Sequence, residues 1–114
     1  MKETAITKFM KERKELNKYV MKYADTGIKR FFSLDNQTYR EGVLDKKTKE
    51  MLGFVASLVL RCEDCIDYHL SRCHEEGVTD EEFAEVVNIG MIVGGSITVP
   101  HIRRAFKKWD ELKS

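Results

Sequence analysis

The pattern of apolar positions changes near residue 27. Residues 4–24 are highly charged but keep apolar side chains at helical spacing, which predicts an amphipathic helix that ends before Gly27. The apolar stripe of this helix consists of Phe9, Leu16, Val20 and Tyr23. Residues 28–44 are apolar without a clear period. We therefore expect a short helix or loop there, which packs aromatic side chains onto the core or onto a neighbouring subunit.

The middle of the chain begins with a strong helix signal. Asp45 is a suitable N-cap for a helix that starts at Lys46 and carries a dense apolar run from Met51 to Leu60. Because apolar residues occur on nearly every side of this helix, we expect it to be almost completely buried. A second helix follows at about 61–76 and contains two cysteines.

Glycines and caps define the last third of the chain. Gly77 is a natural left-handed helix end, and Thr79 with Glu82 forms a capping box that opens a helix to about 93. Residues 94–96 then break the chain, and a final helix runs to about 112 with Pro100 in its first turn or two. The apolar side of this helix carries Ile102, Ala105, Phe106 and Trp109. Gly90 and Gly94, four positions apart, indicate a close helix crossing rather than a phosphate site, because no strand precedes them.

These elements predict an all-α, single-domain bundle of about five to six helices. Residues 1–44 would supply the N-terminal helix and an aromatic-rich packing segment, and residues 45–114 the core. The chain has only one proline and lacks the alternating β-branched runs of a sheet. At 114 residues and 13.3 kDa it is long enough for a modest core, which association would supplement.

Charge and terminal composition narrow the function. The 20 basic and 19 acidic residues nearly cancel, so no net field favours nucleic acid or an acidic membrane. No segment approaches the roughly 18 apolar residues of a membrane span, and the N-terminal residues lack the apolar core of a signal peptide. We expect a cytoplasmic protein that binds neither nucleic acid nor membrane.

The most informative chemistry is a Cys-x-x-Cys-x-x-x-His unit formed by Cys62, Cys65 and His69. On one helix the three side chains fall within an arc of roughly 60°, so two thiols and an imidazole share a face. Residues three apart have Cα atoms about 5 Å apart, within the range that a disulfide requires. His69 lies one turn beyond Cys65, where an imidazole takes the thiol proton or stabilises the thiolate. The unit predicts a dithiol redox site.

A zinc site and a purely structural cysteine pair are the alternatives. Zinc needs about four converging ligands, and the only nearby candidate for the fourth is Cys73. On one helix Cys73 lies about 16 Å along the axis from Cys62, too far for one ion. We expect Cys73 to be a small buried core residue, and a reducing cytosol favours a cysteine pair that cycles between thiol and disulfide.

The surroundings of this unit carry a family resemblance. Lys-Thr-Lys-Glu at 47–50 precedes the cysteines, with twelve positions from Glu50 to Cys62. Glu-Glu-Gly-Val-Thr-Asp-Glu-Glu and a Gly-Gly break follow the unit. Over roughly residues 45–112 this arrangement resembles the alkylhydroperoxidase D-like branch of the carboxymuconolactone decarboxylase family.

The resemblance implies an all-α homo-oligomer, usually a trimer or hexamer, with a thiol peroxidase or disulfide-reductase site. In that family the residue matching Cys65 attacks a hydroperoxide and becomes a sulfenic acid, and the residue matching Cys62 resolves it to a disulfide. Glu50 and His69 match the proton-relay carboxylate and imidazole. The resemblance implies no bound cofactor, but an external dithiol or lipoyl-type reductant that closes the cycle.

Geometry constrains the role of Glu50. On one straight helix Glu50 would lie about 18 Å along the axis from Cys62, so it joins the site only if the chain reverses near Arg61. Such a turn brings Glu50 back toward His69 and places the cysteines in the first turn of a new helix, whose positive end favours thiolate. Otherwise Glu50 is a solvated acid of its own helix.

Two positions depart from the best-known peroxidases of the family. Asp64 stands where those proteins have a histidine, beside Glu63, and a nearby negative charge opposes thiolate formation. Arg61 occupies a position where glycine is common. His74 and His101 show no partner at useful spacing, so we expect them to have surface or structural roles.

The sequence supports a thiol-dependent peroxidase and leaves three alternatives. A disulfide reductase or redox sensor would react with protein disulfides but not with peroxides. A decarboxylase-type enzyme would keep its activity after both cysteines are replaced, since the lactone-decarboxylase branch generally lacks the pair. An interaction module would carry an inert pair.

Overall fold

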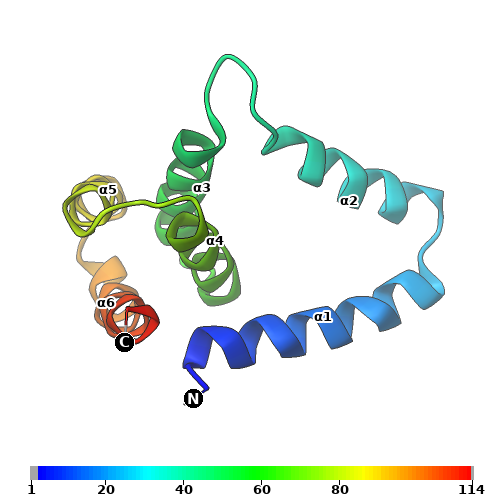
Figure 1. The fold of residues 1–114 in the computed structure, drawn as a ribbon, viewed down its shortest axis with the longest axis horizontal. Helices are drawn as coiled ribbons and strands as arrows, with labels where there is room; N and C mark the ends of the chain where they lie inside the picture. The colour runs from blue at the N-terminus through cyan, green and yellow to red at the C-terminus, as the bar shows by residue number, and fades with distance from the viewer. Residues whose placement is uncertain (1–2, 114) are drawn as a thin grey trace.

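The protein folds into six α-helices and one short 3-10 helix, and no strand occurs within residues 3–113, the part that this computed structural model describes. The helices are α1 (Ala5–Tyr23), α2 (Thr26–Thr38), α3 (Lys46–Leu60), α4 (Glu63–Glu75), α5 (Asp80–Gly94) and α6 (Val99–Leu112), with η1 (Ser96–Thr98) between the last two. Helices α3 to α6 form the packed body, and α1 and α2 extend from it as an arm (Figure 1). The all-α prediction is confirmed.

The helix boundaries follow the predicted caps. The Asp45 side chain accepts a hydrogen bond from the Thr48 amide at 2.8 Å, where α3 begins. Thr79 and Glu82 exchange the two bonds of a capping box at the start of α5. Residues 28–44, left open between helix and loop, form most of α2 and the segment that follows it.

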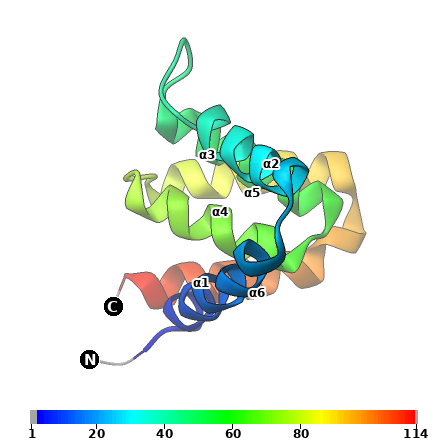
Figure 2. The same ribbon diagram turned by 90° about the vertical axis from the view of Figure 1, so that its right-hand side faces the viewer.

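The core lies where α3, α4, α5 and α6 meet, and Ile6 of α1 closes one side (Figure 2). Phe83 of α5 stacks on Trp109 of α6 with ring centroids 4.1 Å apart. Cys73 is completely buried in this core, as predicted. Val78, between α4 and α5, is also buried, and further buried side chains come from all four helices: Phe54, Leu58, Ile66, Leu70, Val87, Ile102 and Ala105.

Helices α3 and α5 cross closely at Gly90. A Cβ atom on Gly90 would lie 2.6 Å from Cδ2 of Leu58. One on Gly94 would lie 2.6 Å from Cγ2 of Thr98 in η1 and at an ordinary contact distance, 3.5 Å, from the Val59 backbone. The predicted close crossing of helices is therefore confirmed at Gly90, whereas Gly94 makes room for the side chain of Thr98.

For the single chain, one expectation about packing is wrong and another is reduced to one of its two alternatives. Helix α3 is not almost completely buried, because it packs against α4 and α5 on one side and leaves Leu52 and Leu60 mostly exposed. Helix α2 has no buried residue, and its Phe31 side chain is 69% exposed, so the aromatic residues of α2 do not pack onto the core. The other alternative, packing onto a neighbouring subunit, stays a prediction.

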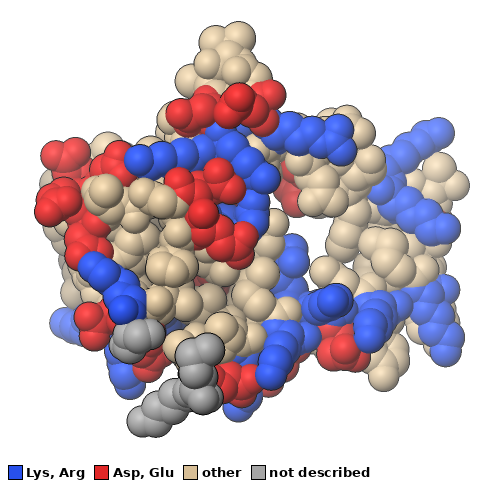
Figure 3. All heavy atoms as spheres, in the orientation of Figure 1, with Lys and Arg blue, Asp and Glu red and all other residues tan. Residues whose placement is uncertain are grey.

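The outer surface of the protein carries both signs of charge. Figure 3 shows basic and acidic side chains interspersed over one face, with a hollow between the arm and the body. Within residues 3–113, no helix is both long enough and apolar enough to cross a membrane.

Candidate functional site

The turn between α3 and α4 determines where the cysteines lie. Arg61 adopts a left-handed conformation with φ of 58°, which explains why glycine suits this position. Its amide donates to the Leu58 carbonyl at 3.0 Å, and the Cys62 amide donates to the Ser57 carbonyl at 3.2 Å. These bonds satisfy the last carbonyls of α3 while the chain reverses.

Cys62 and Cys65 occupy the N-terminus of α4. Cys62 is the N-cap residue rather than a helical residue, and its Sγ accepts a hydrogen bond from the Cys65 amide at 3.2 Å. The shared helix face predicted for both cysteines is therefore wrong in detail, because α4 begins at Glu63. The two are joined by a disulfide with Cα atoms 5.2 Å apart. Cys65 lies in the first turn, where the positive end of the helix dipole favours a thiolate.

The reversal of the chain brings Glu50 beside His69. Glu50 is 1% exposed, and its Oε1 lies 2.8 Å from Nδ1 of His69. Arg72, one turn along α4 from His69, approaches the other carboxylate oxygen at 3.6 Å. Glu50 is thus a buried, paired carboxylate and not a solvated acid.

A missing side chain makes room for this pair. A Cβ atom on Gly53 of α3 would lie 2.7 Å from Cε1 of His69 and 2.9 Å from the hydroxyl of Tyr39. The imidazole therefore rests directly on the backbone of α3. Tyr39 and Tyr68 both contact the ring, with centroids 5.0 and 5.1 Å from it.

Glu63 is directed away from the cysteines toward α6. Arg104 donates to its carboxylate at 2.8 Å, and His101 and Lys108 also lie against it. Burial would raise the pKa of Glu63, but the hydrogen bonds from Arg104 and His101 and the charge of Lys108 outweigh burial and hold its pKa at about 2. No residue at useful spacing in the sequence offered His101 a partner, and the folding of α6 against α4 supplies Glu63, a contact that agrees with the structural role expected of His101.

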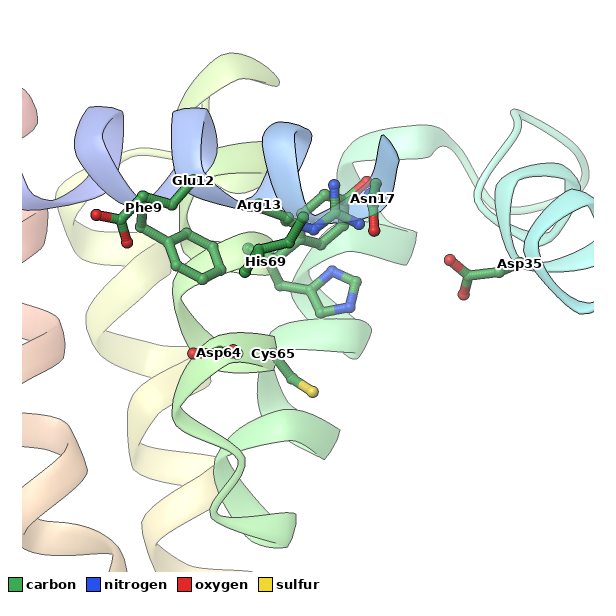
Figure 4. Close-up of a pocket in the computed structure, with 10 residues that line it drawn as sticks. Phe9, Glu12, Arg13, Asn17, Asp35, Asp64, Cys65 and His69 are labelled. Atoms are coloured by element: carbon green, nitrogen blue, oxygen red, sulfur yellow. The ribbon is translucent and has the colours of Figure 1, made fainter. Parts of the chain in front are cut away.

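An open cleft of about 430 Å³ leads to Cys65 between α1 and α4. Figure 4 shows Cys65 and His69 projecting from α4 toward the same side, with Arg13 of α1 above them. The Arg13 guanidinium lies 4.0 Å from the centroid of the Tyr68 ring. The cleft is lined by Phe9, Glu12, Arg13, Leu16, Asn17, Asp35, Asp64, Cys65, Tyr68 and His69. Cys62 does not line it.

The structure therefore brings together all four candidate residues, Glu50, Cys62, Cys65 and His69, and their catalytic roles stay predictions. Sequence reasoning missed Tyr39 and Tyr68. Tyr68 directly precedes His69, so its position in the sequence could have indicated a contact with the imidazole. The contact of Tyr39 with His69 spans 30 positions and has no local sequence signal. Within residues 3–113, no three side chains of the His, Cys, Asp and Glu types are placed to hold a metal ion.

A family model and several solved structures match this chain, and all of them point to one family. The model of a family described as carboxymuconolactone decarboxylase matches residues 28–108. A crystal structure of TM1620 from Thermotoga maritima is 54% identical, with a TM-score of 0.91 and coverage of 93% of both chains. A second structure of TM1620, described as a family member and a candidate participant in an antioxidative response, is also 54% identical, with a TM-score of 0.89 over 93% of this chain and 90% of that one. A family protein from Legionella pneumophila, lpg0406, shares the fold at 23% identity, with a TM-score of 0.85 and coverage of 96% and 97%.

Proposed function

The chain belongs to the carboxymuconolactone decarboxylase family, and we propose that it is a thiol-dependent peroxidase that reduces hydroperoxides through Cys65. The observation that carries the proposal is a cysteine pair, closed as a disulfide at a helix N-terminus, beside a buried Glu50–His69 pair. The antioxidative association of the Thermotoga maritima protein agrees with it.

In the first step, the Cys65 thiol loses its proton to His69 and the thiolate attacks the terminal oxygen of the hydroperoxide. The O–O bond breaks, the protonated His69 returns a proton to the leaving alkoxide, and an alcohol departs. Cys65 is left as a sulfenic acid. Exposure favours this assignment, because Cys65 is exposed and lines the cleft whereas Cys62 is half-buried.

In the second step, Cys62 attacks the sulfur of the sulfenic acid. The S–S bond forms, the S–O bond breaks, and the thiol proton of Cys62 leaves with the hydroxyl group as water. The disulfide then takes two electrons and two protons from an external dithiol or lipoyl-type reductant, which becomes a disulfide itself. No bound cofactor enters this cycle.

The cleft favours uncharged alkyl hydroperoxides as substrates. Phe9 and Leu16 supply apolar lining, while Glu12, Asp35 and Asp64 place three carboxylates along the cleft against the single guanidinium of Arg13. Because like charges repel, a hydroperoxide bearing its own carboxylate would enter less readily than a neutral one.

Trapping of the sulfenic acid tests the proposal. The Cys62→Ser variant cannot resolve the intermediate, so treatment with cumene hydroperoxide and dimedone should label Cys65 stoichiometrically, as read by mass spectrometry. The double variant Cys62→Ser, Cys65→Ser, which retains Cys73, is the control. Label on Cys73 or no label would overturn the proposal. Activity with protein disulfides but not with peroxides would support the reductase alternative.

A further inference from the structure

Tyr39 makes a contact that the proposed reaction does not yet use. Its hydroxyl lies 3.4 Å from Nε2 of His69, on the opposite side of the imidazole from the Nδ1 that faces Glu50. The contact is long for a hydrogen bond, so the hydroxyl orients the ring without binding Nε2 tightly.

The segment that carries Tyr39 is attached to α3 on both sides of this residue. The ammonium group of Lys49 donates to the carbonyl of Thr38 at 2.9 Å and to that of Arg40 at 2.7 Å. Lys49 directly precedes Glu50. The same turn of α3 therefore carries Glu50, one partner of His69, and anchors the segment of Tyr39, the other partner. Gly53, one turn further, has no Cβ to displace either the imidazole or the tyrosine hydroxyl.

We propose that Tyr39 is a positioning residue for His69, whose hydroxyl holds Nε2 both before and after that atom takes the proton of Cys65. The inference rests on the proposed function, in which His69 deprotonates the thiol. It gives Tyr39, which lies outside the Cys-x-x-Cys-x-x-x-His unit, a role in positioning the imidazole.

The hydrogen-bonding capacities of the groups fit this role. The Glu50 carboxylate accepts from Nδ1–H, which leaves the lone pair of neutral His69 on Nε2. A tyrosine hydroxyl both donates and accepts. It donates weakly to Nε2 in the resting state. Because Nε2 has a single lone pair, the hydroxyl hydrogen turns away as the thiol proton reaches that lone pair, and the tyrosine oxygen then accepts from the new N–H. No proton is gained or lost by Tyr39.

The surroundings keep this hydroxyl protonated. Burial raises the pKa of Tyr39, and the charges of Asp35 and Glu50 raise it further. The group therefore remains a donor throughout the pH range in which a thiol is titrated.

Removal of the hydroxyl alone tests the proposal. In a Cys62→Ser background, the rate of Cys65 alkylation by iodoacetamide is followed against pH, which needs no peroxide. Tyr39→Phe keeps the ring and should slow the reaction about 3- to 5-fold, the lower part of the range for loss of one hydrogen bond, because the contact is long. Lys49→Met should slow it in the same direction, because it releases residues 38–40 from α3.

Two further measurements separate positioning from packing. In a His69→Ala background, Tyr39→Phe should change nothing more, since residues that act as a unit are not additive. In spectra of the protein labelled with [15N]histidine, Tyr39→Phe should shift the Nε2 resonance of His69. The matched control Tyr68→Phe, which alters the other ring against His69, should leave that resonance in place.

The proposal is overturned if Tyr39→Phe leaves the alkylation rate within about twofold and the Nε2 resonance unmoved, or if it slows the His69→Ala variant equally. These readouts are independent of peroxide chemistry. A protein that forms no sulfenic acid but shows the Tyr39 dependence would refute the proposed function and retain the positioning role.

Discussion

Glu50 Oε1 lies 2.8 Å from Nδ1 of His69, although the two residues are 19 positions apart and belong to consecutive helices. The left-handed turn at Arg61 makes this contact, because it folds α4 back along α3. A carboxylate at Nδ1 holds the imidazole as the tautomer whose lone pair lies on Nε2, the atom that accepts the proton.

We expect His69→Ala to slow the reaction of Cys65 by about 100-fold or more, the usual contribution of a general base. Alkylation rate against pH is measured for the two single-cysteine variants, with and without His69. His69 lies one turn from Cys65 and two turns from the level of Cys62, so the Cys65-only protein should react faster. A faster Cys62-only protein would reverse the two roles.

Under mild oxidant, Cys62 and Cys65 should form a reversible disulfide while Cys73 stays a free thiol. Burial, with a smaller contribution from the charge of Glu50, raises the pKa of Cys73 to about 12, so almost no thiolate exists there at neutral pH. Peptide mapping checks the pairing, and alkylation of Cys73 should require denaturant. A dominant disulfide that includes Cys73 would contradict this structure.

The Gly53→Ala variant should lower the reactivity of Cys65 about tenfold or more, because the new methyl group displaces the imidazole of His69. Gly90→Ala is the matched control. It adds the same methyl group to a helix against Leu58, on the side of α3 that faces α5. We expect it to change the free energy of unfolding but not the alkylation rate. Equal rates for both variants would contradict the role given to Gly53.

Glu63 should make stability depend on pH in the acid range. Its folded pKa of about 2 lies below the ordinary value of 4.5, so its contribution is fully present above about pH 5 and is lost as the pH falls through 4.5 toward 2. Glu63→Gln should therefore cost about 1 kcal/mol at pH 7 and much less near pH 2, by urea unfolding. The exposed Asp110→Asn variant serves as the control, and an equal loss at both pH values would contradict this assignment.

The protein should be a stable oligomer in solution, as both the family resemblance and the surface of the arm indicate. Tyr23, Phe31 and Leu34 are each more than 60% exposed, as are Ile92 and Val93 on α5. Burial of such apolar side chains between subunits is favourable. Light scattering should give a mass several times 13.3 kDa, with a trimer or hexamer expected. A particle of one chain at micromolar concentration would disprove this.

The helices and the reacting groups follow from signals that are local in the sequence. N-cap residues such as Asp45 and Thr79 bond to amides within one turn, so the start of each helix can be predicted from adjacent residues. The same holds for the spacing of Cys62 and Cys65, because three positions along a chain allow a disulfide wherever the segment folds.

The surroundings of those groups depend on contacts between residues far apart in the sequence. The neutralisation of Glu63 by Arg104 spans 41 positions, and the placement of Tyr39 on His69 spans 30. Neither has a periodic signal, because such contacts depend on how whole helices pack. The exposure of Leu52 and Phe31 in the single chain could not be predicted for the same reason. An apolar side chain shows that burial is favourable but does not specify which surface covers it.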